Sequence, residues 1–212
     1  MADQQWAHVV DSVRVVRDLV AAPEVASTWG EESTCAGMTV GGLAVHTASQ
    51  ADHLGRLLGQ RPHDQEPIPL VEHYRRAAWS NSDLDSEANA GIRDGSNAEA
   101  EVGHDAALTQ VDEWLATLER VVGGEVPGTV HIPWQGWSLT TEDFVATRLM
   151  EMVVHTDDLA AGVGLPTPEF PERAVAETMR LLTAVAVDRH GQAAVVRALS
   201  RPQRAPASVS AF

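Results

Sequence analysis

The stretch RLMEMVVHTDDLA, residues 148–160, determines most of what we expect of this chain. Its apolar residues recur at steps of three and four, which is typical of an amphipathic helix. On the face where a core helix carries Leu or Val, however, it has Arg148, Glu151 and His155. Buried polar groups cost free energy unless they have partners, and buried charges cost much more. The stretch therefore predicts a helix whose inward face has a chemical role.

A second predicted helix, over residues 39–59, is interrupted in the same way. Thr39 is a suitable N-cap and Gly59 a suitable stop. Between them His46 and Gln50 stand on a stripe that is otherwise made of leucine. Two helices thus each carry polar residues toward the core, and one metal ion held between them would give both sets a partner.

The candidate ligands are His46, Glu151 and His155. Glu151 and His155 are four residues apart, so both can reach one ion from one turn of helix, and His46 can approach from the facing helix. Two histidines and one carboxylate leave a coordination position open, as in catalytic zinc sites, although ferrous iron uses the same set. The alternatives are an exposed Glu–His ion pair and a core histidine that is satisfied by hydrogen bonds.

Helical periodicity dominates the rest of the chain. Residues 70–95 read as one short helix and a loop with partial helix, and could cover the site as a lid. Four long helices with one long connection predict a bundle, and an αα-superhelix is the alternative, without a repeat period to support it. Besides 39–59, helices are expected over 3–21, 98–122, 140–161, 171–190 and 192–199, with a loop or short strand over 131–137.

The composition excludes several classes of protein. The chain has 212 residues and a net charge of −15, which argues against binding to nucleic acid or to an anionic membrane. It has no apolar run of membrane-spanning length and its N-terminus lacks the layout of a signal peptide. A single cysteine allows no internal disulfide. We therefore expect a cytoplasmic protein, for which a homodimer is one possible assembly.

Four other polar residues have simpler expected roles. Cys35 lies in a Gly/Thr loop with no obvious base beside it and is expected to be a bystander rather than a nucleophile. His53 is expected to be exposed. Asp157 and Asp158 follow the helical turn that carries the candidate ligands, and either could orient a ligand imidazole. The favoured interpretation is that both are acidic residues that face solvent.

Three segments resemble a known family. GMTVGGLAVHTASQADHL, residues 37–54, and RLMEMVVHTDDLAAGVGLP, residues 148–166, resemble two signatures of the mycothiol-dependent maleylpyruvate isomerase family, a branch of the DinB-like proteins. DRHGQAAVVRALSR, residues 188–201, is similar to C-terminal segments of its members. The chain departs from the pattern at Met38, where Trp is frequent, and at Gly42, where an acidic residue is frequent.

The resemblance implies an all-α fold, a DinB-like up-down-down-up four-helix bundle with additional C-terminal helices. It implies a divalent metal, usually zinc, held by His46, Glu151 and His155. The family's isomerase carries a C-terminal substrate-binding domain after the bundle. Here we expect a metal-binding bundle over 1–165 and a helical extension packed on it over 166–212.

The leading functional hypothesis is a metal-dependent transferase or isomerase that uses a low-molecular-weight thiol, with mycothiol as the expected cosubstrate and a small electrophile as substrate. Arg148 is the candidate catalytic residue, because a guanidinium can bind a substrate carboxylate in a bidentate manner, although it could instead pair with Glu151 or a backbone carbonyl. One alternative is a hydrolase that uses metal-bound water, with His53 or Asp52 as base. The other is a bundle that binds a metal or ligand without catalysis.

Overall fold

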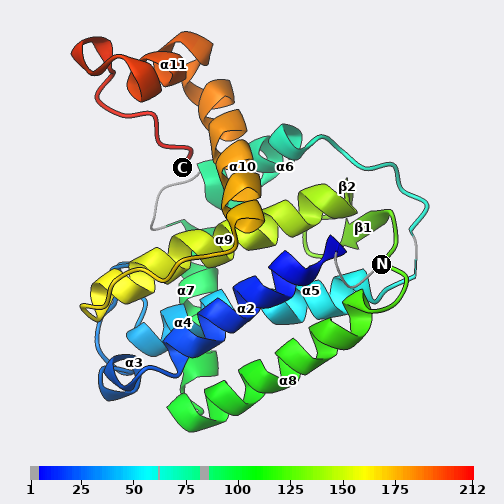
Figure 1. Ribbon diagram of the computed structural model, residues 1–212, viewed down its shortest axis with the longest axis vertical. Helices are drawn as coiled ribbons and strands as arrows, with labels where there is room; N and C mark the ends of the chain where they lie inside the picture. The colour runs from blue at the N-terminus through cyan, green and yellow to red at the C-terminus, as the bar shows by residue number, and fades with distance from the viewer. Residues whose placement is uncertain (1–4, 62, 82–85) are drawn as a thin grey trace.

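The chain folds as the all-α, DinB-like bundle that the sequence predicts. A computed structural model describes residues 5–61, 63–81 and 86–212. In Figure 1 the first and last bundle helices run in one direction and the two between them run the opposite way, which is up-down-down-up connectivity. The bundle consists of α2 (Ala7–Val20), the consecutive pair α4 (Val40–Ala48) and α5 (Gln50–Leu58), α8 (His104–Val122) and α9 (Thr141–Gly162).

The second bundle segment begins where the sequence predicts but is interrupted once. Thr39 accepts a hydrogen bond from the backbone at 2.9 Å and caps the first turn of α4. The expectation of one helix over 39–59 is wrong at Ser49, where α4 ends and α5 begins. The side chains of Ser49 and Gln50 both donate to the carbonyl of His46 at 2.8 Å. Such side-chain donors compete with the backbone N–H that would continue the helix.

The expected third helix over 98–122 is also wrong, because two helices meet within it. Helix α7 ends at Ala100, and α8 begins at His104 after Gly103, which has a φ of 87°. Glycine adopts this left-handed conformation without steric cost, so the chain turns sharply there. Residues 82–85 of the expected lid lie outside the described residues. The elements between α5 and α8 are α6 (Leu70–Arg76), a short 3-10 helix (Ala78–Asn81) and α7 (Glu87–Ala100).

A small hairpin leads into the ligand-bearing helix. Strands β1 (Thr129–Ile132) and β2 (Trp137–Thr140) pair antiparallel, so the loop or short strand expected over 131–137 is the turn and part of both strands. Thr140 ends β2 and accepts a hydrogen bond from the Asp143 N–H at 3.1 Å. The hairpin therefore fixes the point at which α9 begins.

Two further helices follow the bundle. Helix α10 packs against α9, α2 and α6, and leads into α11. A separate apolar cluster joins Met150 of α9 to Leu181 of α10, and both are at most 2% exposed. The extension is thus held to the bundle by its own buried contacts. The remaining helices are α3 (Pro23–Ser27), α10 (Glu172–His190), α11 (Gln192–Ser200) and a 3-10 turn (Pro202–Arg204).

The last residues turn back toward α10. Arg189 donates to the carbonyl of Ala211 at 2.9 Å, and Ala211 is buried. In Figure 1 the C-terminus accordingly lies near α6 rather than beside the far end of α11. The division of the chain into 1–165 and 166–212 stays a prediction.

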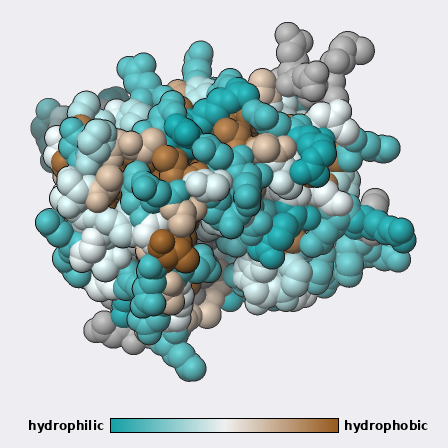
Figure 2. All heavy atoms as spheres, turned by 90° about the horizontal axis from the view of Figure 1, so that it is seen from below, coloured by the Kyte–Doolittle hydropathy of each residue, from teal (hydrophilic) through white to brown (hydrophobic). Residues whose placement is uncertain are grey.

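The bundle has an apolar core and a polar exterior. Seen from the side of α8, the surface is largely hydrophilic, with small apolar patches between polar side chains (Figure 2). In the described part of the chain, no helix is both long and apolar enough to cross a membrane. The side chains that fill the centre of the bundle include Leu43, Leu54, Phe144, Leu149 and Leu159, all fully buried.

Candidate metal centre

Three side chains from α4 and α9 converge at the centre of the bundle. The Nε2 atom of His46 lies 3.6 Å from Oε2 of Glu151, and Nε2 of His155 lies 3.3 Å from the same oxygen. The ring centroids of the two histidines are 5.1 Å apart. The structure thus brings together all three residues that the sequence singles out as candidate ligands.

The packing of the two helices explains why these side chains meet. Along α9 the stripe begins at Phe144 and ends at Leu159, and both are fully buried. Leu43, one turn before His46 on α4, is fully buried as well. Residues three or four apart share one face of a helix. The apolar anchors at the ends of each stripe therefore hold the polar residues between them against the neighbouring helix.

The charges at this site are strongly coupled. Burial alone would raise the pKa of Glu151, but hydrogen bonds from His155 and His46 outweigh it, so the pKa lies well below its usual range. Burial alone would lower the pKa of His155, but its hydrogen bonds with Asp158, Cys35 and Glu151 raise the pKa well above the usual value. Glu151 and His155 therefore each favour the charged form of the other.

The geometry of the three atoms fits a divalent cation. Zinc bonds of about 2.0–2.2 Å at tetrahedral angles place neighbouring ligand atoms about 3.3–3.6 Å apart. The two distances to Oε2 of Glu151, 3.3 and 3.6 Å, fall in this range. All three candidate ligand atoms lie within 4.8 Å of one another. His46, Glu151 and His155 could thus hold one ion without rearrangement of the helices.

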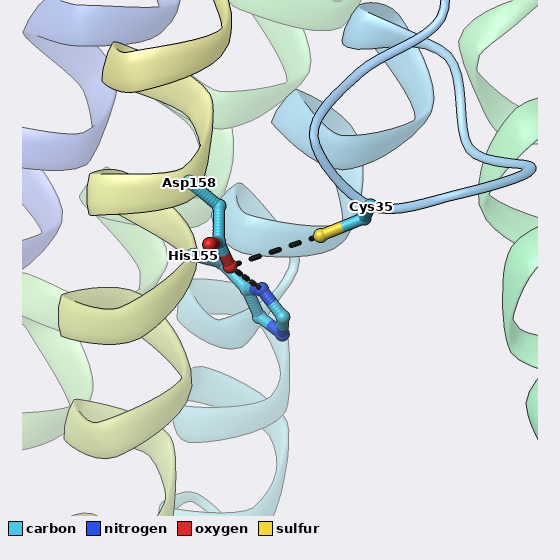
Figure 3. Close-up of side chains that lie close together, drawn as sticks. All are labelled: Cys35, His155 and Asp158. Carbon is cyan, nitrogen blue, oxygen red and sulfur yellow. Dashed lines mark hydrogen bonds and ion pairs between the residues drawn. The ribbon is translucent and has the colours of Figure 1, made fainter. Parts of the chain in front are cut away.

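Behind the candidate ligands, a second contact orients the imidazole of His155. Its Nδ1 atom lies 3.0 Å from Oδ2 of Asp158, one turn further along α9. This contact leaves Nε2 pointing toward Glu151. Figure 3 shows that the same carboxylate faces the thiol of Cys35, which lies on the loop before α4. The Cys35 sulfur donates to Asp158 at 3.7 Å.

These contacts correct two expectations. Asp158 is a partner of the imidazole and not only a solvent-facing carboxylate, because it contacts the His155 ring, whereas Asp157 is exposed and accepts a hydrogen bond from Thr167. The Cys35 thiol does have polar partners, since it donates to Asp158 and is hydrogen-bonded with His155. The three-residue spacing from His155 to Asp158 was a usable signal in the sequence. Nothing in the sequence around Cys35 indicated where its loop would pack.

Arg148 lies one turn before Glu151 but does not form an ion pair with it. Its Nη1 donates to Oε1 of Gln50 at 2.7 Å, and its Nε donates to the Thr147 hydroxyl at 3.1 Å. Gln50 is almost completely buried. The second interrupted stripe therefore provides the partner that holds this guanidinium at the site.

Two histidines beside the site are neutral. His53 is half-buried, not exposed as expected, and its ring lies 5.1 Å from that of Trp134. Burial, with the nearby positive charge of Arg148, lowers the pKa of His53 to about 3. His73, which the sequence did not single out, is buried and accepts a hydrogen bond from Trp137 at 3.0 Å. Burial lowers its pKa to about 4.

The fold and the site together define a helical bundle with a candidate His–Glu–His metal centre. Residues 9–160 match the family described as the mycothiol maleylpyruvate isomerase N-terminal domain, and the chain belongs to this family. The match runs from within α2 to within α9 and includes all three candidate ligands. No curated protein and no solved structure matches the chain. The family name associates the chain with mycothiol and with an isomerase-type reaction.

Proposed function

We propose that the chain is a divalent-metal-dependent enzyme, with zinc as the expected ion, that uses mycothiol as cosubstrate. It would activate the thiol for attack on a small electrophile, as a transferase or an isomerase. The observation that carries this proposal is the approach of His46 and His155 to one carboxylate oxygen of Glu151, at 3.6 and 3.3 Å. Membership of the family supports the choice of thiol.

Each polar residue of the site has a role in this proposal. His46, Glu151 and His155 would hold the ion, and an ion bound there would keep a coordinated thiol deprotonated at neutral pH. Asp158 accepts from Nδ1 of His155, which would leave Nε2 of this ring available to bind the ion. Three protein ligands leave one tetrahedral position for the sulfur. The chain would thus supply a nucleophile without a separate general base.

Arg148 would bind a carboxylate of the electrophile. Two of its nitrogens are used in hydrogen bonds to Gln50 and Thr147, and it is in no ion pair with the described residues. Its remaining nitrogen, Nη2, donates to no other described residue, so a substrate carboxylate could accept from it. A hydrogen bond to a charged group contributes about 1.5–3 kcal/mol, so we expect Arg148→Lys to raise KM for a carboxylate substrate by roughly tenfold or more.

The hydrolase alternative has less support. Hydrolysis by a metal-bound water needs a general base of suitable pKa near the ion. The pKa of His53 is about 3, so this ring is a poor proton acceptor at neutral pH. Asp52 is held by Arg56 in an ion pair of 2.8 Å. Neither candidate base therefore has the properties that the reaction would require.

The test is a turnover assay with maleylpyruvate and with a panel of simple electrophiles, with and without mycothiol, on protein of measured zinc content. We expect activity only when both zinc and thiol are present, and a KM defect in Arg148→Lys. An S-conjugate as product identifies a transferase, and a rearranged substrate identifies an isomerase. Turnover without thiol would favour the hydrolase. One zinc per chain with no turnover would favour the non-catalytic bundle.

A further inference from the structure

A cavity of about 690 Å³ lies between α5, α7 and α8 and extends to His46. Binding sites for small molecules commonly have volumes of about 300–1,000 Å³, so a ligand of several hundred daltons fits here. His46 belongs both to the wall of this cavity and to the candidate metal centre. A molecule in the cavity can therefore place one end beside a candidate metal ligand.

The wall formed by α7 contains two glycines that packing does not explain. Gly91 and Gly95 lie one turn apart in the interior of the helix and both line the cavity. A Cβ atom at either position would meet nothing within 4 Å. Glycine in a helix interior costs about 1 kcal/mol relative to alanine. The two glycines therefore weaken α7 while keeping this side of the cavity open.

The other two walls differ in polarity. Asp52 and Arg56 of α5 line one wall together with Ser49, which precedes this helix, and α7 adds the carboxylate of Glu99. Asp52 and Arg56 neutralise each other at 2.8 Å, and Glu99 forms no ion pair with the described residues. The balance of these charges is negative, which disfavours an anionic ligand. The α8 wall is mainly apolar, and its lining residues include Ala106, Ala107, Val111 and Trp114.

We infer that this cavity binds the uncharged, polyhydroxylated body of the thiol cosubstrate, which in mycothiol is an N-acylated glucosaminyl-inositol; the inference rests on the proposed function. Hydroxyl groups of such a ligand can donate to the carboxylates of Asp52 and Glu99, which a dicarboxylate cannot do. The apolar faces of its rings can pack against Trp114. With the rings in the cavity, the cysteinyl sulfur extends toward His46.

The assignment separates the two substrates in space. Arg148, which would bind the carboxylate of the electrophile, does not line this cavity. The thiol would thus approach the ion from the side of α7, and the electrophile from the side of Arg148. The cavity is then the part of the site that distinguishes a glycosylated thiol from a small one such as cysteine.

The test uses N-acetylglucosaminyl-inositol, which is the pseudodisaccharide without cysteine, titrated into isotope-labelled, metal-free protein by NMR. Neither sulfur nor metal is present, so the readout is independent of the proposed chemistry. Gly95→Leu fills the cavity from α7. Ala98→Leu adds the same side chain at an exposed position of α7 that does not line the cavity, and serves as the matched control.

We expect wild type and Ala98→Leu to bind the probe with similar affinity, and Gly95→Leu to bind at least about tenfold more weakly. Thermal melting should show Gly95→Leu to be no less stable than wild type, because leucine favours helix. No binding to wild type, or binding unaffected by Gly95→Leu, would overturn the inference. Mycothiol-dependent turnover could persist in that case, so failure of this assignment is distinguishable from failure of the proposed function.

Discussion

Replacing Glu151 with glutamine removes the only negative charge among the three candidate ligands and leaves the shape of the side chain almost unchanged. Because both histidines approach its Oε2 atom, the substitution should weaken metal binding more than it disturbs packing. A metal present at a hundred times its Kd stabilises a folded protein by about 2.7 kcal/mol. For a domain of this size that corresponds to roughly 5–10 °C in Tm.

The assay is therefore the difference in Tm with and without zinc, together with zinc content by elemental mass spectrometry. We expect about one zinc per chain and the full shift in wild type, and neither in Glu151→Gln. Each variant is compared with itself, with and without zinc. An effect of the substitution on the stability of the metal-free protein therefore cancels. Glu142→Gln makes the same charge change at an exposed position of the same helix, and should behave as wild type.

The contrary result has a definite meaning. A Glu151→Gln protein with full zinc content and an unchanged shift would show that the carboxylate is not a ligand. The contacts of Glu151 with His46 and His155 would then be an internal ion-pair network. Loss of zinc in Glu142→Gln as well would point to a general effect of charge on the protein.

Three further predictions test the fold and the site. Gly41→Ala should destabilise the protein by about 1–3 kcal/mol, because the added Cβ would lie 2.5 Å from the Trp29 ring. Gly91→Ala should instead stabilise it by about 0.5–1 kcal/mol, because nothing lies within 4 Å of the added Cβ. Equal effects of the two substitutions in chemical denaturation would contradict the described packing. The raised pKa of His155 contributes stability that is present below its unfolded pKa and is lost as pH rises through the folded value. The Tm of metal-free protein should thus fall in the alkaline range, while zinc affinity rises with pH as the proton leaves; an affinity independent of pH in calorimetry would count against His155 as a ligand. Cys35→Ser should keep the bound zinc and change kcat by only a few-fold, and a loss of about 100-fold or more would make this thiol part of the catalytic machinery.

The sequence predicted the bundle because its signals are local and periodic. The cap at Thr39 is confirmed, and it follows from one side chain and the backbone beside it. The errors arose where a single residue interrupts a periodic pattern. Ser49 separates α4 from α5, and Gly103 directly precedes α8, each within a stretch whose apolar spacing continues on both sides. Apolar periodicity indicates which face of a helix is buried. It does not indicate where one helix ends and the next begins when the buried face stays the same.

The candidate ligands were predictable for a related reason. Glu151 and His155 are polar residues at positions where the period requires apolar ones, so they stand out without knowledge of the fold. His73 and Cys35 lie in segments without a clear period, and their place depends on how loops pack. The neutral state of His53 also could not be read from the sequence, because it results from burial and from the charge of Arg148 on another helix.

The polar stripe of α9 is tolerated inside the bundle because each member has a specific partner. Arg148 donates to Gln50 on α5, Glu151 lies between two imidazoles, and His155 contacts Asp158. These contacts hold the side chains in position against their neighbours. Preorganised ligands lose less conformational freedom on binding, which favours tight coordination. Arg148, Glu151 and His155 would be unfavourable in the core without partners. The contacts that make their burial possible are thus the same contacts that make the site rigid.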